Sequence, residues 1–376
     1  MKNILKTYNI ELIAEGPVFI GSGREISKKE YTFSKSFSEV YIFDLIKLVS
    51  FLKSKNLYNE FEKYMRGFEK QDLGKWLISN GVKVQEFGAC TKYKYDCSDV
   101  HMDNLRELQI LEIMRDPYGK PYVPGSSLKG ALRTALLATD ISKNPKKYAD
   151  ITNKKIQYNE TNKYYYTSLA NELEKRFAYV LNKDSRNINN AVNDFMSGII
   201  VSDSEVLSNE DIMLCQRTEL HVDGRSNVLP VLRECIKPGT VIRFKLTVDE
   251  SICNAEKSYK ITEKELLEAV KTFCVKYNNA FVRKYSRIEA EDGDYIWLGG
   301  SSGYATKTEV YQLYNHNDAV KTIVDIFSKT MNPKQYKQHK HEMDTRYGVS
   351  PHICKVAKYK GQYFEIGKCK ITIEKA

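Results

Sequence analysis

A glycine- and serine-rich segment that leads into a helical pattern carries the strongest sign of chemistry in this sequence. It runs Pro124-Gly125-Ser126-Ser127-Leu128-Lys129-Gly130. The free N–H groups and the positive dipole end of a helix can bind phosphate, and the hydroxyls of Ser126 and Ser127 add donors. Lys129 and Arg133 are four residues apart, so both project from one helix face. The segment fits a contact to an RNA backbone, and it fits a routine turn with two solvated cations equally well.

Two further glycine clusters could approach a ligand closely. The later one is Gly299-Gly300-Ser301-Ser302-Gly303, and Lys307 follows it. Three glycines in five residues allow close approach to the backbone, although a flexible hairpin tip would have the same composition. The earlier cluster contains Gly21, Gly23 and Arg24. It fits a bulge at the end of a strand as well as it fits a contact loop.

Evidence for catalysis or metal binding is weak. None of the six histidines sits in a recognisable nucleophile or metal motif. Cys90, Cys97 and His101 could together face a zinc ion, but structural zinc takes four ligands. His339 and His341 read as an exposed basic stretch. We therefore predict no catalytic residue, no metal and no cofactor.

The composition indicates a folded protein with an anionic partner. Hydrophobic residues make up 42% of the 376 residues, which excludes a mainly disordered chain. The net charge is +10, and residues 329–376 hold eleven Lys or Arg against four Asp or Glu. Four tyrosines are interleaved with this basic stretch: Tyr336, Tyr347, Tyr359 and Tyr363. Cations beside aromatic rings suit single-stranded nucleic acid, and an ordinary solvated basic face is the alternative.

The chain should be a cytoplasmic protein without membrane contact. No apolar run approaches the ~18 residues of a membrane span. Lys6 and Glu11 interrupt the stretch where a signal peptide needs apolar residues. The eight cysteines contain no Cys-x-x-Cys pair and do not suggest a disulfide framework.

The hydrophobic periodicity predicts an α+β fold. Alternation predicts strands at Tyr8–Leu12 and Thr240–Val248, and a capping box at Thr262 begins a long helix. We also expect a surface loop over 143–166, helices over 168–182 and 186–197, and a strand over 199–206. The order of elements after residue 200 fits a ferredoxin-like β-α-β-β-α-β pattern. The predicted domains are residues 1–200, with helical insertions near 45–105 and 140–200, and residues 201–376.

Several motifs together resemble a known family. The run from Arg115 to Arg133, with its central Pro-Gly-Ser-Ser-Leu-Lys-Gly, resembles the signature of CRISPR RAMP proteins. The segment Gly16–Gly23 is similar to the start of that superfamily. Leu229–Thr240, the Gly299–Gly303 loop and Arg346-Tyr347-Gly348 resemble the family of the fifth Csm subunit in type III-A effector complexes.

This resemblance implies two tandem ferredoxin-like (RRM-like) domains and a non-catalytic subunit. It implies binding near the 3′ end of the guide RNA, capping of the filament of backbone RAMP subunits, and support of guide maturation and antiviral defence. The implied partners are guide RNA, other Csm subunits and host nucleases. The cleaving backbone subunit has an Asp after its first Gly-x-Gly, whereas residues 24–30 here contain none.

The expected RNA contacts follow from the matching motifs, together with the thumb-like hairpin of RAMPs, which should fall near Arg217–Arg225. They are Gly21, Arg24, Ser126, Ser127, Lys129, Arg133, Arg217, Arg225, Gly299, Gly300, Ser301, Ser302, Gly303 and Lys307. Two other functions remain open. A RAMP endoribonuclease that processes precursor guide RNA could use His101 or His221 as a general acid or base. A protein-docking platform could use the basic surface to meet acidic partners.

Overall fold

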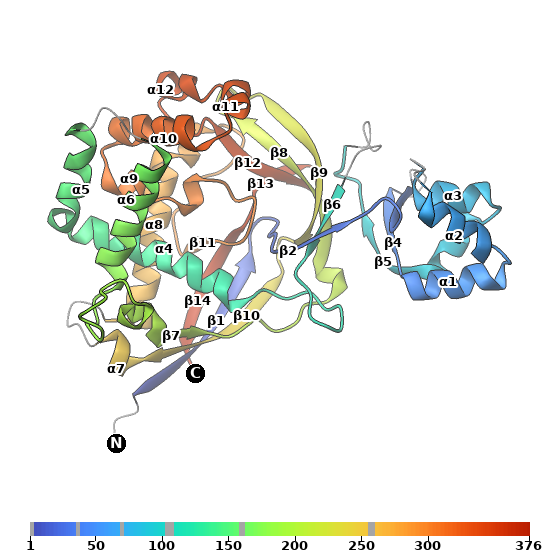
Figure 1. Cartoon of the computed structure of the whole chain (residues 1–376), viewed down its shortest axis with the longest axis horizontal. Coiled ribbons are helices and arrows are strands. Elements are labelled where there is room, and N and C mark those ends of the chain that lie inside the picture. Colours follow the sequence, from blue (N-terminus) through green and yellow to red (C-terminus); the bar gives the residue numbers. More distant parts are fainter. Residues whose placement is uncertain (1–3, 35–37, 68–70, 102–108, 158–161, 255–259) are drawn as a thin grey trace.

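The computed structural model describes residues 4–34, 38–67, 71–101, 109–157, 162–254 and 260–376 (Figure 1). Two large β-sheets with helices around them form the main body, and a smaller sheet with its own helices projects at one end. The mixed α+β class is therefore confirmed. Among the described residues, no helix is both long enough and apolar enough to cross a membrane.

A five-stranded antiparallel sheet forms the middle of the main body. Its order is β11 (Tyr295–Trp297), β14 (Lys368–Lys375), β1 (Leu5–Ala14), β10 (Val241–Asp249) and β7 (Ile199–Val201). Alternate residues of β1 and β10 are buried, as their period of two predicts, since successive side chains of a strand point to opposite faces. Helices α4 (Gly125–Lys143) and α8 (Glu263–Ala280) pack against each other and against this sheet.

A six-stranded sheet lies beside it. Its order is β13 (Gln362–Glu365), β12 (Ile353–Tyr359), β8 (Ile212–His221), β9 (Ser226–Ile236), β6 (Gln109–Ile113) and β2 (Gly21–Ile26). One face contributes Leu214 and Leu220 to the main hydrophobic core. The opposite face carries a smaller apolar cluster that includes Met213, Cys215 and Phe19. Both large sheets contain strands from either side of residue 200, so the two halves of the chain interlock.

The projecting lobe is built on a three-stranded sheet. It consists of β3 (Tyr31–Ser34), β4 (Glu39–Phe43), β5 (Thr91–Asp96), α1 (Leu45–Ser54), α2 (Tyr58–Arg66) and α3 (Leu73–Ser79) (Figure 1). Asp44 caps α1 by accepting hydrogen bonds from the amides of Ile46 and Lys47. The lobe has its own aromatic core around Phe61 and Trp76.

The remaining helices cluster around α4 and α8. They are α5 (Pro145–Gln157), α6 (Lys163–Ala178), α7 (Glu250–Cys253), α9 (Val310–Leu313), α10 (His316–Thr330), α11 (Pro333–His339) and α12 (Asp344–Tyr347). In Figure 1, α5, α6, α9 and α10 lie on the side of the main body away from the lobe.

The predicted surface loop over residues 143–166 is wrong. Helix α5 occupies most of it, and α6 begins at Lys163. The reason is that Tyr148 and Ile151 are buried on one side of α5, three residues apart, within an otherwise polar stretch. The buried Tyr148 hydroxyl also donates a hydrogen bond to Asp140 of α4.

Two other predicted elements are shorter than expected. The helix predicted over 186–197 is replaced by two 3₁₀ turns, at 191–193 and 195–198. Asp184 accepts hydrogen bonds from the Asn187 amide (3.1 Å) and from the Asn190 side chain (2.9 Å), which favours turns over a helix. The strand predicted over 199–206 ends at Val201, because Ser204 hydrogen-bonds to the Val123 backbone next to α4.

Candidate nucleic-acid interface

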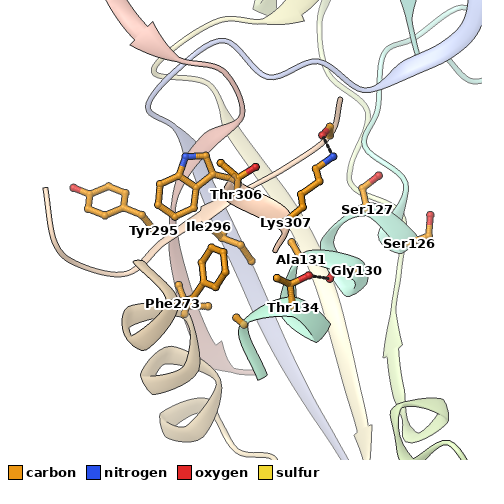
Figure 2. A pocket seen from close by; sticks show the side chains of 14 residues that line it. Ser126, Ser127, Gly130, Ala131, Thr134, Phe273, Tyr295, Ile296, Thr306 and Lys307 are labelled. Atoms are coloured by element: carbon orange, nitrogen blue, oxygen red, sulfur yellow. Dashed lines mark hydrogen bonds between the residues drawn. The ribbon is translucent and has the colours of Figure 1, made fainter. Parts of the chain in front are cut away.

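The two main glycine segments meet at one pocket. Figure 2 shows Ser126 and Ser127, from the start of α4, on the pocket that Lys307 also lines. Gly299 belongs to the same wall, and the pocket volume is about 350 Å³. Aromatic and aliphatic side chains form the rest of its lining, among them Val270, Phe273, Tyr295, Ile296 and Trp297. A serine-bearing helix start, one lysine and an aromatic wall therefore face a common space.

Helix α4 begins at Gly125, so the predicted loop is the first turn of the helix. Only glycine fits at this position, because a Cβ atom would lie 2.3 Å from the Ser202 carbonyl oxygen. The Gly125 amide donates to Oδ1 of Asp203 at 2.9 Å. An internal carboxylate therefore already occupies part of the positive helix end. Ser126 and Ser127 remain beside the pocket.

Lys129 and Arg133 lie together on α4, but neither lines this pocket. Arg133 forms ion pairs with Asp194 (3.0 Å) and Glu174 (3.7 Å). Burial lowers the pKa of Lys129, although the nearby Asp194 acts in the opposite direction. Arg133 thus serves contacts within the protein, and the prediction that Lys129 and Arg133 contact RNA stays a prediction.

The Gly299–Gly303 loop is fixed by packing against the start of the chain. Gly299 has a φ of +72°, and a Cβ atom there would lie 2.1 Å from the Phe19 carbonyl oxygen. The Gly300 amide donates to that same oxygen at 2.9 Å, and Lys307 Nζ donates to the Gly299 carbonyl at 2.6 Å. Burial lowers the pKa of Lys307. Within the loop, Ser302 is buried and Ser301 has a positive φ of 71°.

The other predicted contacts lie on the six-stranded sheet. Gly21 and Arg24 are on β2, where Arg24 Nη1 donates to Glu112 Oε1 at 2.9 Å and Nη2 donates to Glu30. Strands β8 and β9 form the predicted hairpin. Arg225 at its tip is paired with Asp223 at 2.7 Å. Arg217 lies along β8, paired with Glu219 at 3.2 Å. The predicted residues thus form several groups, of which Ser126, Ser127, Gly299 and Lys307 share the pocket.

Comparison with known proteins decides the family. Residues 11–304 match the family model described as the RAMP superfamily. The chain belongs to the RAMP superfamily. The predicted resemblance to the fifth Csm subunit is also confirmed. A curated relative from Mycobacterium tuberculosis, named "CRISPR system Cms protein Csm5", is 28% identical over the full length of both chains. A second with the same name, from Streptococcus thermophilus, is 26% identical and covers 82% of this chain and 81% of its own length.

Solved structures share the RAMP fold. A chain of "Cryo-EM structure of Csm-crRNA-target RNA ternary complex in type III-A CRISPR-Cas system" aligns with a TM-score of 0.66 and 18% identity, covering 97% of this chain and all of its own. The "Crystal structure of T.onnurineus Csm5" aligns with a TM-score of 0.57 and 20% identity, covering 81% of this chain and 93% of its own.

This RAMP protein also holds a buried histidine–aspartate cluster that sequence reasoning missed. Asp344 is fully buried and accepts hydrogen bonds from Nδ1 of His341 (3.1 Å), Nδ1 of His352 and the Ser350 hydroxyl (2.6 Å). The expectation that His341 is exposed is therefore wrong, because the carboxylate holds its ring inside. The only signal in the sequence is the three-residue spacing between His341 and Asp344.

The cluster has the geometry of a hydrogen-bond centre. The ligand atoms of His341, Asp344 and His352 lie within 4.8 Å of one another, close enough for a metal ion in principle. However, Nδ1 of each ring already hydrogen-bonds to a carboxylate oxygen of Asp344, and these hydrogen bonds account for the arrangement. Burial opposes ionisation of Asp344, yet the three hydrogen bonds outweigh it and lower its pKa. The ring of His221 adjoins the cluster, 5.4 Å from that of His352.

Proposed function

We propose that this RAMP protein is a non-catalytic, RNA-binding subunit of a type III-A CRISPR (Csm) complex. The observation that carries the proposal is the pocket at which Ser126 and Ser127 meet Lys307 and the Gly299 loop within a RAMP fold. A helix start, a lysine and an aromatic wall supply donors for phosphate and a face for base stacking. The relatives named Csm5 support the assignment to this complex, and the one from Mycobacterium tuberculosis is matched over its full length.

The subunit would bind guide RNA toward its 3′ end. There it would cap the filament of backbone RAMP subunits and support guide maturation and antiviral defence, with host nucleases trimming the guide. In this proposal residues 1–200 and 201–376 are tandem ferredoxin-like units. The RNA-contact residues named from the sequence motifs would line the path of the guide, and the groups on α4 and on the β8–β9 hairpin would bind separate stretches of it.

Affinity purification from the protein's own host tests this function. The tagged chain should recover other Csm subunits together with RNA of spacer-repeat sequence. Ribonuclease treatment during purification separates the two kinds of contact, and a filament cap should retain protein contacts to the backbone RAMP subunit after treatment. Recovery of RNA of mixed origin, with no Csm partner, would contradict the proposed function and leave only the assignment of the fold supported.

An endoribonuclease is the alternative, and one observation favours it. Nδ1 of His221 is buried and has no hydrogen-bond partner among the described residues. Burial, followed by the neighbouring His352, lowers the pKa of His221, so the ring is neutral at pH 7 and can accept a proton. Purified protein incubated with repeat RNA in the absence of metal should leave it intact. Discrete cleavage that is lost in His221→Ala or His101→Ala would replace the non-catalytic proposal.

A further inference from the structure

Three cations lie together on the six-stranded sheet, on the face that carries the small apolar cluster. Arg217 is on β8, Arg233 on β9 and Lys355 on β12, and β8 lies between the other two strands. In the register, Cys215 is opposite Arg233, and Glu219 is opposite Lys355. Positions two apart on β8 share a face, so Arg217 lies diagonally between the other two cations. We call Arg217, Arg233 and Lys355 the cationic cluster.

Arg233 is the central feature of the cluster. It is only 9% exposed, and its Nε and Nη1 atoms are buried without a hydrogen-bond partner among the described residues. An arginine cannot shed its charge in a protein, so the guanidinium remains a buried cation with unused donors. Its centre lies 5.5 Å from the Phe19 ring, a contact that holds the plane in place but accepts none of its N–H groups. A buried donor left unsatisfied is unfavourable by about 1–3 kcal/mol.

The cluster has too little negative charge around it. Among the described residues, Glu219 is the acid whose charge acts most on Lys355, and it is already paired with Arg217 at 3.2 Å. Burial, followed by the charge of Arg217, lowers the pKa of both Arg233 and Lys355. Nε of Arg217 is also buried without a partner among the described residues. Three cations therefore face one carboxylate on a largely dehydrated surface.

Two acids of nearby strands point to the other side of the sheet. Glu234 on β9 bonds to Tyr93, Tyr95 and Arg115 there, and Glu365 on β13 bonds to Tyr277 in the main core. Alternation along the strands excludes both carboxylates from the face of the cluster. Among the described residues, β9, β12 and β13 thus supply no second counter-charge for it, and Glu25, which shares the face, lies on β2 beyond β6.

The cationic cluster adjoins the glycine loop. A Cβ atom at Gly303 would lie 3.8 Å from the Lys355 side chain, and the charge of Lys307 acts on Lys355. Lys307 also lines the pocket beneath Ser126 and Ser127. The pocket and the cationic cluster therefore both adjoin this loop.

We propose that Arg217, Arg233 and Lys355 bind a phosphodiester group of the RNA strand. The inference rests on the proposed function and adds the residues that hold the backbone beyond the pocket. Phosphate suits the site because its charge offsets the excess of cations and its oxygens accept hydrogen bonds from guanidinium and ammonium groups. The same face of the sheet carries apolar side chains, among them Phe19 and Ala357.

Neutral variants of the full chain test the site. We would measure binding of a labelled single-stranded RNA with the recovered guide sequence, over a range of salt concentrations, for Arg233→Met and Lys355→Met. Each should weaken binding about tenfold and reduce the magnitude of the salt slope by about 0.7, the value for one lost phosphate contact on a single strand. Arg66→Met is the matched control, because Arg66 is 78% exposed on α2 in the lobe, and it should change neither quantity.

Melting of the ligand-free variants separates binding from folding. Removing one of three mutually repelling cations should leave the melting temperature of Arg233→Met equal to or above that of the wild type. Unchanged affinity and salt slope in folded Arg233→Met and Lys355→Met would overturn the site. Failure of the wild type itself to bind RNA would overturn the proposed function. In that case the melting temperature would be measured with inorganic phosphate. A rise that is lost in Arg233→Met would assign the site to a free anion instead of RNA.

Discussion

At the scale of single residues, Asp344 organises more of its surroundings than any other buried acid near the C-terminal strands. It joins His341, His352 and Ser350 through hydrogen bonds beneath the β8–β9 hairpin. Because the folded carboxyl has a lowered pKa, its ionised form stabilises the fold above the unfolded pKa of about 3.9. That contribution is lost as the pH falls through the folded pKa.

Asp344→Asn should therefore reduce the free energy of unfolding by about 3 kcal/mol at pH 7. The difference from the wild type should shrink as the pH falls below about 4, where the unfolded carboxyl takes up a proton, and further as the folded carboxyl takes one up at its lower pKa. Chemical denaturation across that pH range measures it. Glu62→Gln, on an exposed carboxylate of α2, is the control and should show no comparable change. A constant difference at all pH values would contradict the assigned ionisation.

Two glycines make a matched test of the pocket. Gly299→Ala should destabilise the fold by about 2 kcal/mol or more, because its φ is positive and the new Cβ meets the Phe19 carbonyl. Gly130→Ala lies on α4 with open space around it and should stabilise the fold by about 0.5–1 kcal/mol. Since Gly130 lines the pocket, the added methyl should nevertheless weaken RNA binding. Thermal melts and RNA titrations of both variants measure this, and a stabilised Gly130→Ala with full RNA affinity would exclude the pocket as the binding site.

The glycines and serines that set the backbone geometry could be predicted from the sequence. The buried charged side chains could not. The local composition and a family motif identify Gly125, Ser126 and Gly299 from the sequence alone. Arg233 and His341 lie within ordinary strand and basic patterns, and their significance depends on which neighbours face them. Such neighbours come from strands far apart in the chain, so no local pattern reveals an unpaired guanidinium or a shared carboxylate.

At the scale of elements, a buried acid on β9 helps to link the lobe to the main body. Glu234 is fully buried and accepts hydrogen bonds from the hydroxyls of Tyr93 (2.8 Å) and Tyr95 (2.9 Å) and from the Ile113 amide (3.1 Å). Nη2 of Arg115, 3.2 Å from Oε2 of Glu234, supplies the positive charge. Strand β5 of the lobe is thereby fixed to β9 and β6 of the main body.

Tyr95→Phe should lower the free energy of unfolding by about 1–3 kcal/mol, because Glu234 loses a donor that water cannot replace. Hydrogen exchange should show faster opening of the lobe strands than of β1 and β10. Tyr41→Phe is the control, since its partly exposed partner Glu39 also binds Lys94. Equal destabilisation of the lobe strands and of β1 and β10 would mean that the lobe and the main body unfold as one unit.

The elements that could be predicted are those whose period is uninterrupted. Strand β10 alternates cleanly, and Thr262 caps α8 as its capping box predicts. Helix α5 was missed because its buried positions are few among lysines and asparagines. The strand order could not be predicted, since β1 pairs with β10 and β14 from the far half of the chain.

At the scale of the whole molecule, the net charge of +10 includes one concentrated group of cations. Part of the excess is solvated, while Arg217, Arg233 and Lys355 are concentrated on one sheet face beside the glycine loop. Electrostatic binding of RNA should therefore weaken with rising salt, with a slope that individual cations determine. Arg225→Met at the exposed hairpin tip should change this slope less than Arg233→Met, because Arg225 already pairs with Asp223 in solvent. RNA titrations at several salt concentrations compare the two, and a larger effect of Arg225 would shift the main contact to the tip.

Ultraviolet crosslinking of the purified native complex, followed by mapping of the crosslinked nucleotide, tests the central claim most directly. The account predicts crosslinks between this chain and the 3′ portion of the guide RNA, on peptides that contain the Gly299–Lys307 segment or strands β8, β9 and β12. Crosslinks confined to the 5′ portion of the guide, or their absence from this chain in a complex that retains its RNA, would contradict it.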